Sequence, residues 1–235
     1  VDNYFKPMIT PDGTGVVVSS RRGGDIRLVE FDSGKTRSLG KGVAVTLWKD
    51  KGEVWVYLLD GNGFENKYLT TKNLYRCSLS SPHKRELVWN KSHLSWSNLD
   101  ISRDGAVMGG LFPWPHASVL DMEKKSLKRL GRGCWTALSP DNSKILWVFD
   151  GLHRNLSFFD TRSEEKWTTN INGADGIGGY EVYHPRWSNH IRYFGMTGPY
   201  KEGEGGNKIS GGGKAVEIYI GKFSDDLHSV KEWFK

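Results

Sequence analysis

The chain has 235 residues, and 33 Lys and Arg against 27 Asp and Glu give a formal net charge of +6. Its 29 Gly, 10 Trp, 9 Tyr and 10 Phe fit neither a disordered chain nor a helical bundle, and they favour an all-β fold. No stretch reaches the roughly 18 apolar residues that a membrane-spanning helix needs, and the first four residues carry no secretion signal. We expect a chain without a membrane span, from which a leader could already have been removed.

A short motif that occurs three times is the most informative feature of the sequence. Each copy reads apolar, hydroxyl, Pro or Arg, Asp, then Gly or Asn, and an apolar run follows it. This pattern predicts two strands joined by a tight turn. The copies are Ile9 to Gly13, Ile101 to Gly105 and Leu138 to Asn142, with apolar runs at Gly15 to Val18, Ala106 to Leu111 and Ile145 to Phe149.

Another strand pair with a polar turn is predicted after each of these hairpins, beginning at Ile26, Ser118 and Leu156. Four short strands in up-and-down order form one blade of a β-propeller. Two weaker copies of the motif, anchored at Asp50 and at His190 in the place of the Asp, raise the number of repeats to five. Five repeats in 235 residues give 47 residues per blade on average, within the roughly 40 to 50 residues usual for such repeats.

The predicted fold is therefore an all-β, five-bladed β-propeller of four-stranded antiparallel blades, in a single domain over residues 1–235. The predicted blades cover approximately residues 6–42, 43–92, 93–133, 134–182 and 183–235, and residues 1–5 are a candidate to complete the last blade and close the ring. A two-layer β-sandwich is the alternative, but a sandwich does not require the same turn motif five times.

The hairpin motif resembles the WD40-like repeat of the TolB type, clearly in three repeats and faintly in two. This resemblance implies a propeller but no single chemistry, because such repeats occur in periplasmic envelope proteins, peptidase gating domains and carbohydrate-active proteins. The 235 residues contain no segment similar to the α/β domain that accompanies the repeats in TolB, and no G-x-S-x-G hydrolase turn.

The repeat alignment also predicts where a ligand site would lie. It places Lys6, Ala44, Asn98, Trp135 and His184 at one position near the start of the inner strands, and Met8, Thr46, Asp100, Ala137 and Arg186 two residues further on. By the period of two of a strand, both sets should point the same way, toward a central funnel. The candidate ligand-binding residues are His184, Arg186, Tyr183, Trp135, Asn98, Asp100, Trp114, His116 and His153.

For each of these residues a purely structural role stays open, because inner-strand polar groups can simply bond to neighbouring blades and trapped water. The densest group of candidate ligand-binding residues surrounds His184 and Arg186. Guanidinium binds carboxylate or sulfate through two parallel hydrogen bonds. The stretch is also similar to propeller polysaccharide lyases, the oligogalacturonate and ulvan lyases, but those are longer and seven-bladed, so no catalytic residue is assigned. The Gly-rich segment 202–213 is predicted to be a mobile lid over the funnel.

No metal and no cofactor is predicted. His116, His153 and His184 would share the funnel face, but no H-x-H or H-E-x-x-H spacing supports a metal site. An isoelectric point near 9.2 favours acidic partners. Nucleic acid is not expected, since the basic residues form only short clusters and no known binding module is present. Cys77 and Cys134 can form at most one disulfide, and their spacing does not decide whether they meet.

From these patterns we predict a ligand-binding propeller that recognises a glycan, expected to be anionic, in the funnel and acts outside the cytoplasm. The first alternative is a polysaccharide lyase or glycosidase, with His184 or a nearby Tyr transferring a proton and Arg186 neutralising a uronate. The second alternative is a protein-interaction scaffold.

Overall fold

The computed structural model describes the chain except for residues 1–2, 22–23, 61–69, 96–97 and 202–215. Every regular element of the described part is a β-strand, and none of its residues forms a helix long and apolar enough to cross a membrane. The chain divides into two compact units: unit 1 is Val1–Arg129 and unit 2 is Leu130–Lys235. One expectation, the lid at residues 202–213, falls outside the described residues.

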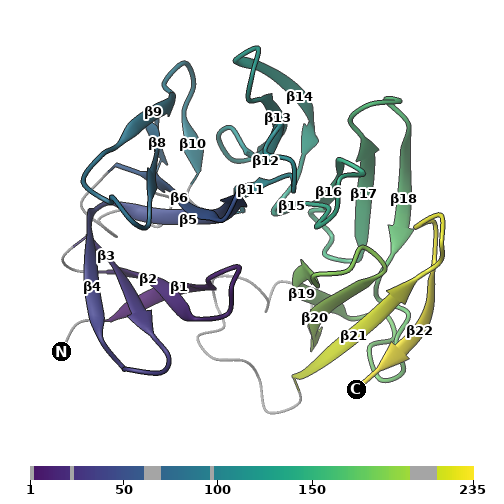
Figure 1. The fold of residues 1–235 in the computed structure, drawn as a ribbon. Helices are drawn as coiled ribbons and strands as arrows, with labels where there is room; N and C mark the ends of the chain where they lie inside the picture. Colours follow the sequence, from purple (N-terminus) through teal and green to yellow (C-terminus); the bar gives the residue numbers. More distant parts are fainter. Residues whose placement is uncertain (1–2, 22–23, 61–69, 96–97, 202–215) are drawn as a thin grey trace. The chain divides into compact units, whose positions relative to one another are not determined.

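Three four-stranded sheets of the described part of the chain begin in unit 1 (Figure 1). Blade 1 contains β1 (Tyr4–Ile9), β2 (Gly15–Ser20), β3 (Asp25–Glu30) and β4 (Thr36–Lys41). Blade 2 contains β5 (Val43–Asp50), β6 (Glu53–Leu59), β8 (Leu74–Ser78) and β9 (Glu86–Trp89). Blade 3 contains β11 (Asp100–Ile101), β12 (Val107–Leu111), β13 (His116–Asp121) and β14 (Ser126–Arg132), whose end belongs to unit 2. The short strands β7 (Thr70–Thr71) and β10 (Leu94–Ser95) pair with each other.

Two four-stranded sheets make up the described part of unit 2 (Figure 1). Blade 4 contains β15 (Thr136–Leu138), β16 (Ile145–Phe149), β17 (Asn155–Asp160) and β18 (Lys166–Asn170). Blade 5 contains β19 (Glu181–Trp187), β20 (Tyr193–Tyr200), β21 (Glu217–Phe223) and β22 (Val230–Phe234). In all five sheets the strands neighbour one another in chain order, so the prediction of an all-β, five-bladed propeller fold is confirmed. Tyr4 and Phe5, expected to complete the last blade, instead pair with Ser20 and Ser19 in blade 1.

The motif Asp closes its turn by accepting hydrogen bonds. In blade 1, the Thr10 hydroxyl donates to Oδ1 of Asp12 at 2.6 Å, and the N–H of Thr14 donates to the same oxygen at 3.1 Å. The Thr10 hydroxyl also accepts the N–H of Gly15 at 3.0 Å, which joins the turn to the next strand. Side chains of this kind favour turns because they bond to the backbone two residues on.

The same turn recurs in blades 3 and 4, as predicted. Ser102 donates to Oδ1 of Asp104 at 2.6 Å, and the N–H of Ala106 donates to it at 3.0 Å. In blade 4 it is Ser143 that donates to Asp141 through both its hydroxyl, at 2.6 Å, and its N–H, at 3.0 Å. The three aspartates therefore occupy equivalent turns.

The buried apolar side chains fill the spaces between adjacent blades within each unit. In unit 1, Val17 and Ile26 of blade 1 pack with Val56 of blade 2. In unit 2, Trp147 and Phe158, both fully buried, lie at the centre of the core between blades 4 and 5. Burying one such side chain contributes about 1.5 to 3 kcal/mol, so the blades of a unit stabilise each other.

Residues with left-handed backbone recur at the start of the inner strands. The pairing register shifts within β1, β5 and β19, as it does at a β-bulge. Lys6, Asn98 and His184, three members of the first aligned set, have φ angles of 51°, 62° and 55°. These three residues, which the repeat alignment places at one position, thus share a backbone conformation. The bulge interrupts the simple alternation that we assumed between the first and second aligned sets.

Candidate functional site

Four predicted site residues come together in unit 2, where blades 4 and 5 meet. Trp135 precedes β15, His153 lies in the turn between β16 and β17, and Tyr183 and His184 belong to β19. The ring centroid of Trp135 lies 5.6 Å from that of His184 and 6.1 Å from that of Tyr183. The rings of His153 and Tyr183 are 4.3 Å apart. We call these four residues the blade 4–5 cluster.

The backbone holds His153 in an uncommon conformation. Its φ is 55°, in the left-handed region that His tolerates better than most residues. Its carbonyl accepts the N–H of Val182 at 3.0 Å, which ties the turn of blade 4 to the first strand of blade 5. A residue in this region persists only when its surroundings fix it, so the position of the imidazole is set by contacts from both blades.

A line of polar groups runs through His153. The Sγ of Cys134 lies 3.4 Å from its Nε2, and the Oε2 of Glu181 lies 3.5 Å from its Nδ1. The Tyr183 hydroxyl donates to the same glutamate oxygen at 3.2 Å. The side chains of His153 and Glu181 are only 16% and 7% exposed. The sequence patterns did not place Cys134 or Glu181 in a site.

Burial raises the pKa of two of these groups. It is the main reason why the pKa of the Tyr183 hydroxyl lies well above its ordinary value, and the charge of Glu181 adds to the effect. Burial also raises the pKa of the Cys134 thiol, together with the carboxyls of Asp150 and Glu181. Both groups are therefore protonated at neutral pH.

His184 is exposed, and one of its ring nitrogens contacts Thr197. The Thr197 hydroxyl donates to the Tyr183 carbonyl at 3.1 Å, accepts from the Tyr200 hydroxyl at 3.1 Å and lies 3.1 Å from Nδ1 of His184. Because its one proton is already used, Thr197 must accept from Nδ1–H, which leaves the lone pair on Nε2. Burial, and then the charge of Arg186, lower the pKa of His184, so the ring is neutral at pH 7.

Arg186 is exposed on β19 of unit 2, where it pairs with Gly195, and the other four predicted site residues lie in unit 1. Asn98 is buried at 4% exposure, and Asp100 begins β11, where it pairs with Gly109. Trp114 is 48% exposed, and His116 begins β13. These four residues are not part of the blade 4–5 cluster, and a funnel that gathers residues from both units stays a prediction.

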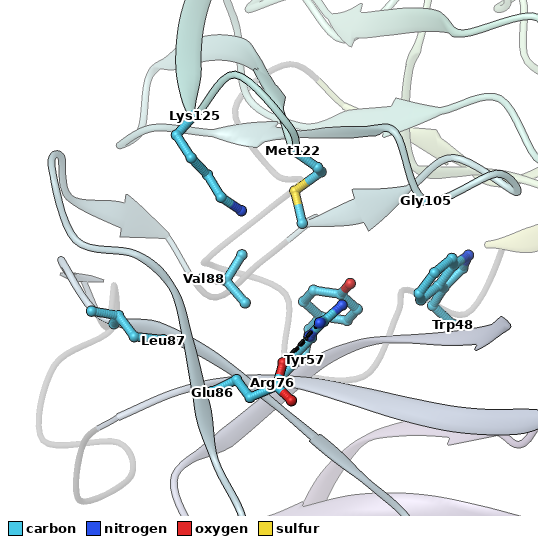
Figure 2. Close-up of a pocket in the computed structure, with 9 residues that line it drawn as sticks. All are labelled: Trp48, Tyr57, Arg76, Glu86, Leu87, Val88, Gly105, Met122 and Lys125. Atoms are coloured by element: carbon cyan, nitrogen blue, oxygen red, sulfur yellow. Dashed lines mark hydrogen bonds and ion pairs between the residues drawn. The ribbon is translucent and has the colours of Figure 1, made fainter.

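A pocket of about 210 Å³ lies between blades 2 and 3 of unit 1, and the sequence patterns did not predict it (Figure 2). Arg76 and Glu86 form an ion pair of 2.7 Å on one side, and the Arg76 guanidinium lies 4.5 Å from the ring centroid of Trp55. Figure 2 shows the Lys125 side chain extending into the pocket from the opposite side. The other lining residues are Trp48, Tyr57, Leu87, Val88, Gly105 and Met122.

Lys125 is the distinctive charged group of this pocket. It has a φ of 52° in the turn after β13, where Asp121 accepts two backbone N–H groups and fixes the turn. Burial, and then the charge of Arg76, lower the pKa of Lys125. Within the described part of the chain its ammonium group makes no ion pair. The pocket therefore contains the positive charge of Lys125, on which the Asp121 carboxylate acts without forming an ion pair.

In the described ranges, no three His, Cys, Asp or Glu side chains are grouped so that they could hold a metal ion. Both cysteines are free thiols: Cys77 is buried and Cys134 is half-buried.

No family model and no curated protein matches the chain. Several solved structures do match the chain. TolB from Acinetobacter baumannii is 14% identical, with a TM-score of 0.54 over 88% of this chain and 49% of that one. A TolB candidate from Agrobacterium tumefaciens is 15% identical, with a TM-score of 0.54 over 98% of this chain and 80% of that one. Hydrazine synthase from Kuenenia stuttgartiensis is 14% identical, with a TM-score of 0.55 over 94% of this chain and 63% of that one.

The chain thus spans about half the length of the Acinetobacter TolB. At such low identity these likenesses show the fold alone. They confirm that the chain has the fold of TolB-type propellers, as its repeat motif indicates. The similarity to propeller polysaccharide lyases stays a prediction.

Proposed function

We propose that the protein is a ligand-binding β-propeller that recognises an anionic glycan at an exposed face of unit 2, formed by Trp135, His184 and Arg186. The observation that carries this proposal is the arrangement of His184, whose ring lies 5.6 Å from that of Trp135 while the charge of Arg186 lowers its pKa. The ring of His184 thus lies beside an indole, and its pKa is lowered first by burial and then by the charge of Arg186. We call these three residues the Trp135 face.

Each group of the Trp135 face suits one part of a charged sugar. The indole offers an apolar surface to the C–H face of a sugar ring. The Nε2 lone pair of His184 can accept a hydrogen bond from a sugar hydroxyl. The guanidinium of Arg186 has the donor geometry for a carboxylate or sulfate. An anionic glycan matches all three groups, whereas a neutral glycan would leave Arg186 without a charged partner in the ligand.

A lyase or glycosidase acting at the same face is the second candidate. The lone pair of His184 Nε2 favours it, because a neutral imidazole can take a proton. Tyr183 does not fit the role of a proton-transfer residue in contact with substrate, since it is 3% exposed and donates to Glu181. Release of unsaturated products, followed by ultraviolet absorbance, separates a lyase from a binder.

A glycan array with uronate-bearing, sulfated and neutral glycans tests the proposal. We expect binding to acidic glycans, and we expect Trp135→Ala to abolish it. Trp233→Ala is the matched control, because Trp233 is also a half-buried indole of unit 2 but packs edge-on against Phe194. No binding to acidic glycans, or an equal loss in both variants, would contradict the proposal; capture of proteins alone would favour a scaffold.

The pocket of unit 1 is a second candidate place for an anionic ligand, in this case a small one. The positive charge of Lys125 beside the apolar side chains of Leu87, Val88 and Met122 favours an organic anion with an apolar body. We also propose an extracytoplasmic location, which the TolB-type repeat motif supports. Fusion to a reporter that is active only outside the cytoplasm tests that location.

A further inference from the structure

Cys134, His153 and Glu181 form an ordered series of contacts: thiol to Nε2 at 3.4 Å and Nδ1 to carboxylate at 3.5 Å. We propose that Cys134 is a nucleophilic thiol, that His153 takes its proton, and that Glu181 is the positioning residue that orients the imidazole. The site would accept an acyl group from a small activated ester. This activity goes beyond glycan recognition and does not depend on it.

The contacts of His153 assign a role to each ring nitrogen. If the thiol donates to Nε2, that nitrogen carries the lone pair and the proton is on Nδ1, which lies 3.5 Å from Oε2 of Glu181 in an ion-pair contact and not in a hydrogen bond. The Tyr183 hydroxyl donates to the same glutamate oxygen at 3.2 Å and so holds the carboxylate in place. A nucleophile, a base and an orienting acid in this order are the arrangement that activates a weak nucleophile.

The imidazole is also held by packing. Its ring centroid lies 5.2 Å from that of Phe149 on one side and 4.3 Å from that of Tyr183 on the other. Its left-handed φ of 55° and the hydrogen bond from Val182 fix the backbone. A base that is held near its nucleophile loses little entropy when it acts.

The titratable groups that face the thiol are His153, Asp150, Glu181 and Tyr183. Burial and the two carboxyls raise the pKa of Cys134, so the thiol does not ionise by itself at neutral pH. We therefore assign to His153 the removal of the thiol proton during the attack, because no thiolate is formed beforehand. A thiolate formed in this way is a strong nucleophile, because nucleophilicity rises with pKa.

The step balances without a redox partner. The sulfur of Cys134 attacks the carbonyl carbon of the ester while Nε2 of His153 takes the thiol proton. When the tetrahedral intermediate collapses, the carbon–oxygen bond to the alcohol breaks and His153 returns the proton to the leaving oxygen. The products are an S-acyl thioester on Cys134 and a free alcohol, and the imidazole is neutral again.

The chain contains its own control for this reaction. Its two cysteines are both free, but Cys77 is 0% exposed whereas Cys134 is half-buried. The probe is 4-nitrophenyl acetate, with peptide mass spectrometry to locate each acetyl group. We expect Cys134 to be acetylated and Cys77 to remain a thiol in the folded protein.

His153→Asn is the decisive variant, because Asn tolerates the left-handed backbone but is not a base. We expect acetylation of Cys134 to slow about 100-fold, the lower end of what a general base contributes. Glu181→Gln should slow it less and shift its pH profile. His228→Asn, which changes an exposed histidine of unit 2 stacked on Trp167, should leave the rate unchanged.

The pH dependence separates a chemical role from a structural one. In the wild type, acetylation should already proceed at neutral pH, where the Cys134 thiol is protonated and needs a base. In His153→Asn the rate should rise only where the thiol ionises. If Cys134 is not acetylated, or if His153→Asn reacts at the wild-type rate with the same pH profile, the proposal is overturned. Should that variant be unfolded by circular dichroism, the wild-type pH profile and the contrast with Cys77 decide the matter. The test uses no glycan, so its failure leaves the proposed function untouched.

Discussion

Asp12 in blade 1 and His190 in blade 5 each accept a backbone hydrogen bond in their hairpin turns, but through different atoms. The Oδ1 of Asp12 accepts the N–H of the residue two positions on at 3.1 Å, and the Nδ1 of His190 does so at 3.2 Å. The imidazole thus replaces the carboxylate as the acceptor that closes the turn, which explains how the repeat survives a substitution of Asp by His.

His190→Asp should be tolerated, whereas His190→Ala should destabilise the protein. The carboxylate keeps an acceptor for the N–H of Arg192, and the methyl group does not. We expect a loss for the alanine variant of about 0.5 to 1.5 kcal/mol in the free energy of unfolding, toward the low end because the turn is exposed. Urea unfolding of both variants measures it, and equal stabilities would show that the hydrogen bond is not needed.

Asp12 should make the stability of the protein depend on acidity. Hydrogen bonds from Thr10 and then Thr14 lower the pKa of Asp12 to about 2 in the folded protein, from 3.8. A depressed folded pKa means that the stabilisation is present above about pH 4 and is lost as the pH falls toward 2. The advantage of the wild type over Asp12→Asn in urea unfolding should therefore shrink across this range. Asp32→Asn changes an exposed aspartate and is the control. If the difference in unfolding free energy between the wild type and Asp32→Asn shrinks over the same pH range, the assignment of the effect to Asp12 is contradicted.

Gly42→Ala should destabilise the protein and Gly151→Ala should not. Gly42 has a φ of 129°, and a Cβ there would lie 2.5 Å from the carbonyl oxygen of Leu59. Strain of this kind costs about 1 to 3 kcal/mol. A Cβ on Gly151 would meet no atom within 4 Å, so that variant should stay within about 0.5 kcal/mol of the wild type. Thermal unfolding of both variants provides the measurement, and similar midpoints would be inconsistent with the clash.

Arg186→Ala should weaken binding of an acidic glycan while the protein stays folded. The expected loss is about 1.5 to 3 kcal/mol, the usual contribution of a hydrogen bond to a charged group. Calorimetry with a glycan selected on the array measures it. Arg162→Ala, which removes a 60% exposed arginine near Asp160, is the control. If Arg186→Ala unfolds instead, the guanidinium is a structural group and the Trp135 face is wrongly assigned.

Lys125→Met should reduce the affinity of the unit 1 pocket for an organic anion by about tenfold, since it keeps the apolar stem and removes a charge worth about 1.5 kcal/mol. The probe is 8-anilinonaphthalene-1-sulfonate, followed by its fluorescence. Lys124→Met is the matched control, because Lys124 lies in the same turn but is 77% exposed and 3.8 Å from Asp121. Equal affinities of the two variants would exclude Lys125 as the anion-binding group.

The hairpin turns could be predicted from the sequence because their hydrogen bonds join residues two to five positions apart, as between Thr10, Asp12 and Gly15. Such local bonds leave a fixed spacing in the sequence, and five repeats of it define the blades. The same alignment placed Trp135 and His184 at equivalent inner-strand positions, and their rings do meet. This contact could be anticipated because adjacent blades bring equivalent positions together.

The contact of Cys134 with His153 could not be predicted in this way. It depends on a left-handed residue in a turn and on a hydrogen bond from the next blade, and neither leaves a spacing in the sequence. The pocket of unit 1 was missed for a related reason. Arg76 and Lys125 face each other from different blades, and a repeat motif specifies the inside of each blade, not the side chains that meet between blades.

The left-handed backbone at the start of the inner strands has an evolutionary consequence. Left-handed backbone is tolerated best by Gly, Asn, Asp and His, and two of the three residues that adopt it there, Asn98 and His184, belong to this set. Blade geometry alone therefore enriches this position in side chains that hydrogen-bond. A propeller of this type would acquire polar recognition groups as a by-product of folding, and a new specificity would need few further substitutions.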